Sequence, residues 1–272
     1  MTITRPGVYQ IDETDYHAHA ALSSTGARTL ANDCPAVFDY RRSHPQAPKQ
    51  EFDLGSAAHK LVLGAGPEIV VVGPDEWRTN AAKGAVAAAR AKGQIPLKPR
   101  DFDTVMAMAD ALRRHPDADE VFAPAGSAEQ SLFWTDMETG VFCRARPDWI
   151  GNGITDYKST TDVSIPHLQK VVAERGYHQQ ADWYLSGAVD RDLIAPDAPF
   201  RLVFQAKTAP YLVTIVELDD VALQIGRDLN RYALETFHNC TTAGSWPGHT
   251  QGIEIIGLPA WIERRHFEGA PA

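Results

Sequence analysis

Apolar residues in the first 114 positions recur mainly with helical spacing. Over 102–114, the residues Val105, Met108, Ala109 and Leu112 lie three or four positions apart, which places them on one face of a helix. Cap, proline and propensity signals predict further helices over about 23–30, 35–42, 54–63 and 80–92, after a short extended piece over 7–11. We therefore expect residues 1–120 to form a mostly helical N-terminal layer.

The pattern changes after residue 125. Runs of strand-like composition occur over 129–134, 141–146 and 154–158, with Gly151-Asn152-Gly153 as one of the turns between them. These three runs are expected to form an antiparallel meander. Helical periodicity returns over 165–188, with a break at Gly176, and two strands over 201–206 and 211–216 precede a long helix over 221–237.

This order of elements indicates a mixed α/β protein. With no internal repeat and no low-complexity linker, we expect a single domain over 1–272. Its α/β core would cover about 125–245, and a tail punctuated by proline and glycine would follow over 246–272.

Composition narrows the class of protein. A chain with 44% hydrophobic and 22% charged residues can bury a core, so a disordered or fibrous protein is excluded. No run approaches the roughly 18 to 20 apolar residues of a membrane span. The N-terminus lacks the apolar run of a secretory signal, and three widely spaced cysteines suit a reducing compartment, so we expect a cytoplasmic protein. A formal net charge of −9 argues against a protein that coats nucleic acid by bulk charge.

Two acidic residues and a lysine carry the most informative chemistry. Asp148 and Asp156 lie on or beside neighbouring strands joined by the Gly-Asn-Gly turn, so their carboxylates can converge. Paired carboxylates suit Mg²⁺ or Mn²⁺. Lys158 lies two positions beyond Asp156, on the same face of the strand. A metal that activates water, with an ammonium group beside it, is what phosphodiester hydrolysis requires.

Two further features extend this set. His59 lies in a helix rich in small residues and offers an imidazole ligand. Gln180 and Tyr184 are four positions apart, so they share one helix face. Taken singly, an acid and a lysine near a turn are usually surface residues, a helical histidine is usually structural, and the amide and phenol can equally cap a core face. Only the ordered set as a whole therefore points to catalysis.

That ordered set resembles the RecB-like branch of the PD-(D/E)XK nuclease superfamily. The matching motifs are His59, Pro147-Asp148, Asp156-Tyr157-Lys158 and Gln180 with Tyr184. Flanking residues are similar to those of phage and prophage RecE-like exonucleases of the exodeoxyribonuclease VIII type. These flanks are Gly7-Val8-Tyr9, Leu22-Ser23-Ser24, Cys34-Pro35-Ala36, Phe52-Asp53-Leu54-Gly55 and Gly176-Tyr177. The resemblance covers about residues 7–190 and implies a mixed central sheet flanked by helices.

The resemblance implies a role for each matched residue. Asp148, Asp156 and His59 would be metal ligands, and the carbonyl of Tyr157 a backbone ligand. Lys158 would be the catalytic lysine, and Gln180 with Tyr184 would form the helix motif. Glu129 would lie near a second metal, although Glu138 is also nearby. The cysteines do not match the iron–sulfur pattern of some RecB-like nucleases.

The activity that the resemblance implies is a Mg²⁺-dependent exonuclease that degrades linear double-stranded DNA from the 5′ end and leaves a 3′ single strand for recombination. It also implies a ring-like homo-oligomer, a single-strand annealing recombinase as partner, and the bacterial cytoplasm if the chain is phage-encoded. Two alternatives stay open. One is an endonuclease on the same fold, and the other is a non-catalytic DNA-binding or recombination scaffold.

Basic residues suggest a path for DNA. As a set they would line a channel for the phosphate backbone, with Trp77 as a wedge or stacking surface, although each one alone is more often a solvated helix-face residue. The set comprises Arg28, Arg41, Arg42, Arg78, Lys83, Arg90, Arg144 and Arg146. Bound cations would offset part of the acidic charge locally, so the net charge of −9 is compatible with an enzyme that handles DNA in one enclosed place.

Overall fold

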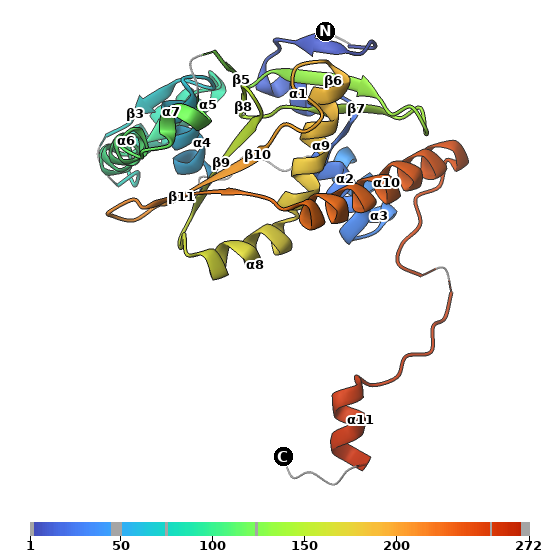
Figure 1. Ribbon diagram of the computed structural model, residues 1–272. Coiled ribbons are helices and arrows are strands. Elements are labelled where there is room, and N and C mark those ends of the chain that lie inside the picture. The colour runs from blue at the N-terminus through green and yellow to red at the C-terminus, as the bar shows by residue number, and fades with distance from the viewer. Residues whose placement is uncertain (1–2, 45–50, 74–75, 123–124, 251, 268–272) are drawn as a thin grey trace.

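A computed structural model of the chain describes residues 3–44, 51–73, 76–122, 125–250 and 252–267. Its architecture is α/β, with mixed sheets flanked by helices, as the sequence predicts (Figure 1). The elements that position the candidate site come from both halves of the chain.

A five-stranded sheet lies at the centre. Its strand order is β11 (Val213–Glu217), β10 (Phe200–Ala206), β9 (Ile154–Thr160), β8 (Trp149–Ile150) and β5 (Ser127–Ala128). Strands β9 and β10 run parallel, whereas β8–β9 and β10–β11 are antiparallel pairs. Because successive side chains point to opposite faces, Leu202 and Phe204 belong to one core and Val203 to another. Both faces of the sheet are therefore covered.

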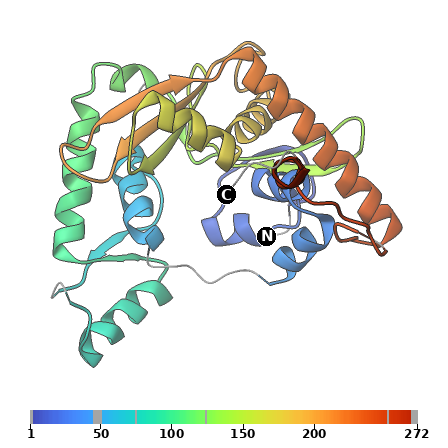
Figure 2. The same ribbon diagram turned by 90° about the horizontal axis from the view of Figure 1, so that it is seen from below.

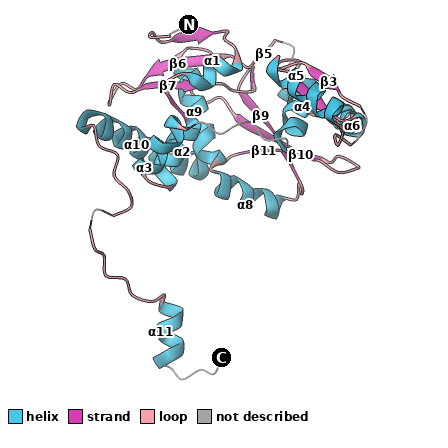
Figure 3. Cartoon of the chain, turned by 180° about the vertical axis from the view of Figure 1, so that it is seen from behind, coloured by secondary structure: helices cyan, strands magenta, loops and turns pink. Residues whose placement is uncertain are grey.

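Two groups of helices provide that cover. One core packs α2 (Ser24–Asn32), α9 (Tyr177–Asp190) and α10 (Asp220–Ala243) against the sheet, with α3 (Pro35–Ser43) beside them. The other core joins α4 (Glu51–Leu63) and α6 (Pro99–Arg113) to strands β9 and β10. Figures 2 and 3 show the two helix groups at opposite ends of the molecule. The central strands thus connect the two groups.

The expected three-stranded meander is wrong in one respect. Strands β6 (Ser131–Thr135) and β7 (Phe142–Ala145) do pair antiparallel, between β1 (Gly7–Tyr9) and β2 (Leu22–Ser23) in a four-stranded sheet. Strand β9 instead belongs to the central sheet. Pro147 lies between β7 and β8 and has no backbone N–H to donate, so it cannot continue a ladder. The chain leaves the first sheet there and enters the second.

Local signals place several helix ends correctly. The Ser23 side chain accepts a hydrogen bond from the Gly26 backbone and caps α2. Gly176, at φ 64°, separates α8 (Ile165–Arg175) from α9, because only glycine adopts this conformation without steric cost. Helix α5 (Asn80–Ala91) also matches its prediction. Helix α10 continues beyond the predicted end to Ala243.

Other elements are short and carry no clear periodicity in the sequence. They are α1 (Glu13–Ala18), β3 (Ile69–Val71), β4 (Ile95–Leu97), α7 (Ala118–Val121) and α11 (Ala260–Phe267). Strands β3 and β4 pair in a small parallel sheet beside α4. Helix α11 lies in the tail, away from the body of the molecule (Figure 1). None of the helices in the described ranges combines the length and apolar character that a membrane crossing requires.

Candidate active site

The β8–β9 hairpin brings the two predicted acidic residues together. Trp149 pairs with Thr155 across the hairpin, so the next positions outward, Asp148 and Asp156, face each other. The backbone N–H of Tyr157 donates a 2.8 Å hydrogen bond to Oδ2 of Asp148. A tight turn within one hairpin thus fixes the separation of the carboxylates, as the spacing predicts.

Asp156 is buried and contacts two other residues of the predicted site. Its carboxylate forms an ion pair with Lys158, which lies on the same face of β9. On the other side, Nε2 of Gln180 donates a 2.9 Å hydrogen bond to Oδ1 of Asp156. The Lys158 ammonium group lies 5.0 Å from the centre of the Tyr177 ring, within reach of a cation–π contact. Helix α9 therefore contributes two side chains that hold the acid–lysine pair.

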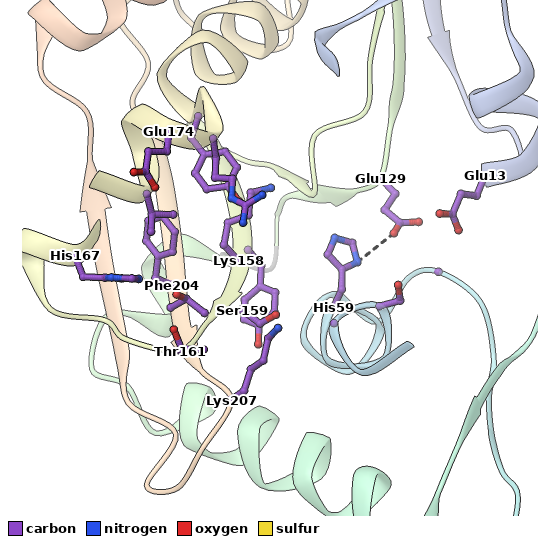
Figure 4. Close-up of a pocket in the computed structure, with 18 of the residues that line it drawn as sticks. Glu13, His59, Glu129, Lys158, Ser159, Thr161, His167, Glu174, Phe204 and Lys207 are labelled. Carbon is purple, nitrogen blue, oxygen red and sulfur yellow. Dashed lines mark ion pairs between the residues drawn. The ribbon is translucent and has the colours of Figure 1, made fainter. Parts of the chain in front are cut away.

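His59 reaches the same place from α4. Its Nε2 lies 3.0 Å from Oδ1 of Asp148, and its Nδ1 lies 3.4 Å from Oε1 of Glu129 (Figure 4). The Glu129 backbone takes a φ of 49°, and its N–H donates to the carbonyl of Asp148. The imidazole consequently bridges two carboxylates from different segments.

Burial and mutual proximity shift the protonation equilibria of this cluster. Burial and the neighbouring Asp148 carboxylate together raise the pKa of Asp156 to about 6. Burial alone would also raise the pKa of Asp148, but His59 and Lys158 outweigh it, so that pKa is lowered. Burial opposes the charged forms of His59 and Lys158, yet the carboxylates outweigh it and raise both pKa values. The site is an interdependent charge network.

A cavity of about 760 Å³ opens beside this network. His59, Glu129 and Lys158 line it together with Glu13 from α1 (Figure 4). Basic side chains of Arg175 and Lys207 also line it. The cavity is thus bordered by carboxylates and by cations that can meet a phosphate. Asp148 and Asp156 are not among its lining residues and are linked to it through His59 and Lys158.

Comparisons with known proteins identify the family and the fold. The family model of a PDDEXK-like domain of unknown function (DUF3799) matches residues 23–259. The chain belongs to this family. The chain is also similar to a crystal structure from Eubacterium rectale, described as a "Putative exonuclease", with a TM-score of 0.61 and 12% identity. That alignment covers 97% of this chain and 100% of the other, and at such low identity it shows the fold alone. A search of curated proteins found no match. Together, the family and the fold support a nuclease of the PD-(D/E)XK superfamily.

In this PDDEXK-like protein, the residues predicted to form the signature motif are Pro147-Asp148 and Asp156-Tyr157-Lys158, which lie within the matched range. The structure brings the side chains of Asp148, Asp156 and Lys158 together with His59 and Gln180. The role of each residue stays a prediction.

The side chains of three other candidate residues make further contacts, which leave the predicted role of the Tyr157 carbonyl untested. The Tyr184 ring lies 6.4 Å from that of Phe200, and burial, with smaller contributions from Tyr16, Asp156 and Asp148, raises the pKa of Tyr184. The Tyr157 side chain points to the opposite face of β9 and donates a 2.7 Å hydrogen bond to Gln205. Glu138 pairs with Arg231 at the β6–β7 turn, so Glu129 is the acidic residue that reaches the cluster.

Two of the arginines expected to line a DNA path are structural instead. Arg144 is buried and donates hydrogen bonds to the carbonyls of Ala21 and His17. Arg146 is part-buried and donates to Ser131 and to the carbonyl of Ile11. Both guanidinium groups fasten the N-terminal segment to β7 and the following turn.

The remaining basic residues of that set lie on helices or loops. Arg28 donates a 2.7 Å hydrogen bond to the carbonyl of Arg175, next to the cavity. Arg41 and Arg42 pair with Asp33 and Asp39, and Arg78 pairs with Glu76. Trp77 donates to the carbonyl of Val72, and its role as a wedge stays a prediction.

Glu13 and Tyr177 line the cavity, although neither is among the site residues predicted from the sequence. Glu13 lies in a six-residue helix, and its proximity to Glu129 depends on how the two sheets pack. Tyr177 does follow Gly176 in a motif already noted, so its position at the start of α9 was the available signal. Glu13 has no comparable sequence signal, because its position at the cavity depends on packing between segments that are distant in the chain.

The donor set fits a hard divalent cation. Asp148, Asp156 and Glu129 supply carboxylate oxygens, and His59 supplies an imidazole. Oδ2 of Asp156 is buried, and its polar contact is the ion pair with Lys158. Oxygen-rich sites of this kind suit Mg²⁺ or Mn²⁺. PDDEXK nucleases generally use divalent metal ions, which agrees with this chemistry.

Proposed function

We propose that the protein is a metal-dependent DNA exonuclease of the RecE-like type. It would remove nucleotides from the 5′ end of one strand of linear double-stranded DNA and leave a 3′ single strand for recombination. The strongest support is the convergence of Asp148, Asp156, Lys158 and Gln180 beside one cavity. The polarity, the duplex preference and the recombination role rest on the resemblance to RecE-like exonucleases.

Four side chains and one carbonyl would hold the cation. They are Asp148, Asp156, Glu129 and His59, with the backbone carbonyl of Tyr157. A bound Mg²⁺ or Mn²⁺ supplies two kinds of chemistry, since it neutralises phosphate charge and lowers the pKa of bound water.

The chain's own residues have separable tasks. Lys158 carries a positive charge at the edge of the cavity and would stabilise the negative charge that develops on the phosphate. Gln180 fixes the orientation of the Asp156 carboxylate through its amide hydrogen bond. The Tyr177 ring restricts the Lys158 side chain to the cavity side of β9. Tyr184 lies four positions beyond Gln180 in α9 and would complete the helix motif.

The form of the cavity favours action at a strand end. Its volume of about 760 Å³ is in the range of small-ligand pockets, so it suits the terminal part of one strand. The cations Arg175 and Lys207 lie on its wall, while the chain as a whole carries a net charge of −9. These two cations and Lys158 are matched by Glu13, Glu129 and Glu174 on the same wall. A bound divalent cation would make the wall net positive and so favour binding of an end over loose association along a duplex.

The proposal includes an oligomeric state and a protein partner. A ring-like homo-oligomer would enclose the duplex, and a single-strand annealing recombinase would receive the 3′ strand. Sedimentation of the purified protein, alone and with such a recombinase, measures both.

In the decisive experiment, the protein is incubated with linear duplex DNA labelled at the 5′ end or at the 3′ end, in parallel reactions with and without Mg²⁺. We expect early release of the 5′ label in the presence of Mg²⁺, while closed circular DNA survives. Asp148→Ala and Lys158→Ala should abolish release. Their matched controls are Asp110→Ala and Lys170→Ala, exposed residues of α6 and α8 that should keep full activity.

Each contrary outcome has a definite meaning. Cutting of closed circles identifies an endonuclease on the same fold. Early release of the 3′ label reverses the polarity. Absence of digestion, together with no heat of Mn²⁺ binding in calorimetry, identifies a non-catalytic DNA-binding or scaffold protein. Digestion that survives Asp148→Ala contradicts the assignment of the site.

A further inference from the structure

A second cluster of metal-ligating side chains lies away from the cavity, where the C-terminal tail meets the junction of α2 and α3. Asp33, Cys34 and His249 each contribute one donor atom, and these three atoms lie within 4.8 Å of one another. Cys34 is a buried free cysteine, and His249 is exposed. Two neighbouring residues near the N-terminus thus meet a histidine from the opposite end of the chain.

The tail is fixed in this place by contacts that precede His249. The Trp246 ring lies 5.4 Å from that of Phe38 and 5.7 Å from that of Phe237. The backbone N–H of Ala36 donates a 3.0 Å hydrogen bond to the carbonyl of Pro247. These contacts hold the tail against the first turn of α3, two residues before the histidine. Packing therefore delivers the imidazole to Asp33 and Cys34.

The two carboxylate oxygens of Asp33 have different neighbours. Oδ2 faces Arg41 at 3.4 Å, whereas Oδ1 faces Nε2 of His249 at 3.5 Å. Two ligands about 2.1 Å from a tetrahedral ion lie roughly 3.4 Å apart. The separation of Oδ1 and Nε2 is therefore close to that of two ligands of one ion. The Cys34 sulfur lies within 4.8 Å of a carboxylate oxygen of Asp33 and of a ring nitrogen of His249.

We propose that Asp33, Cys34 and His249 bind a thiophilic divalent cation of the zinc class and so clasp the tail to the body of the protein. Thiolate and imidazole ligands select Zn²⁺ over Mg²⁺. Binding converts the Cys34 thiol to a thiolate and releases its proton to solvent. Three protein ligands leave the fourth tetrahedral position to water. The oxygen-rich catalytic cluster prefers harder ions, so the two sites would differ in the metal they take.

The test is a titration of the full chain with Co²⁺, with Mg²⁺ in excess, followed by absorption spectroscopy. A sulfur-to-cobalt charge-transfer band reports the Cys34 site, because the catalytic cluster contains no cysteine. We expect this band in the unaltered protein and its loss on addition of Zn²⁺. Cys34→Ser should abolish the band, and His249→Ala should weaken Co²⁺ binding by at least about tenfold. Cys240→Ser is the matched control, since Cys240 is also a buried free cysteine.

Each alternative result overturns the proposal in part or whole. Absence of the band from the unaltered protein excludes the site. A band that survives Cys34→Ser but disappears in Cys240→Ser places the metal elsewhere. Unchanged affinity in His249→Ala excludes the clasp, and this variant is informative because the His249 side chain is 71% exposed and its loss leaves the core intact. The readout does not depend on nuclease activity, so it stands apart from the proposed function.

Discussion

Replacing Gly226 with alanine should destabilise the protein, although alanine is the better helix former. Gly226 lies in α10, where that helix crosses α9. A Cβ atom added there would lie 2.4 Å from the carbonyl oxygen of His178 and 3.1 Å from Cα of Gln179. An ordinary contact begins at 3.4 Å, so the two helices must separate by about 1 Å (3.4 − 2.4). Because the obstacle is backbone, no side-chain rotation can relieve it.

The expected magnitude follows from two opposing effects. Overpacking of a core costs about 1–3 kcal/mol, and contact with backbone favours the upper end of that range. The better helix propensity of alanine offsets about 1 kcal/mol. A net loss of about 2 kcal/mol in the free energy of unfolding follows, and it should lower Tm by roughly 4–8 °C. Because α9 carries Gln180 two positions beyond His178, catalysis should also fall in the folded variant.

Urea unfolding followed by circular dichroism measures the loss. Gly84→Ala is the matched control, since Gly84 lies in α5 with open space around its added Cβ. That variant should gain about 0.5–1 kcal/mol from propensity alone. A Gly226→Ala variant as stable as the unaltered protein, or stabilised like Gly84→Ala, would refute the packing argument.

Three further variants test other parts of the structure. Gln180→Ala should lower kcat roughly 10–100-fold at saturating Mg²⁺, because Asp156 loses the amide that orients it. Full activity in a Gln180→Glu variant, which also lacks the amide donor, would contradict this role of Gln180. Burial would raise the pKa of Asp136, but hydrogen bonds from Arg231 outweigh it and lower the pKa overall. The ionised carboxylate therefore stabilises the fold fully above the unfolded pKa of about 3.9, and this stabilisation is lost as the pH falls through the lower folded pKa. The urea midpoint of Asp136→Asn should therefore vary less between about pH 5 and pH 3 than that of the unaltered protein. Arg144→Met should cost about 1–3 kcal/mol in stability, because buried carbonyls lose their donor, while the DNA affinity of the folded variant, measured by fluorescence anisotropy, stays unchanged.

Features set by neighbouring residues are the ones that the sequence predicts well. The break between α8 and α9 depends on Gly176, and the cap of α2 depends on Ser23. The approach of Asp148 and Asp156 depends on a short hairpin, so spacing along the chain determines it. In each case the physical cause lies within about ten residues.

Features set by packing between distant segments are not visible in the sequence. The alternating composition of β7 and β9 indicates strands but not the sheet that each one joins. Arg144 looks like a solvated cation, because nothing nearby in the chain shows that its guanidinium group is buried against the N-terminal segment. The meeting of His59 with Glu129 depends on how α4 packs against the central sheet.

Because β9 uses both of its faces, the number of residues in the β8–β9 hairpin turn is constrained. One face carries Asp156 and Lys158, and the other carries Tyr157, which bonds to Gln205 and through it to the carbonyl of Met108 in α6. Inserting or deleting a single residue at the hairpin turn would rotate the strand by half a repeat and exchange the acid with the phenol. The turn can therefore change in composition but not in length. In diverged members of the family, the number of residues between the two acids should be kept more strictly than the identity of those residues.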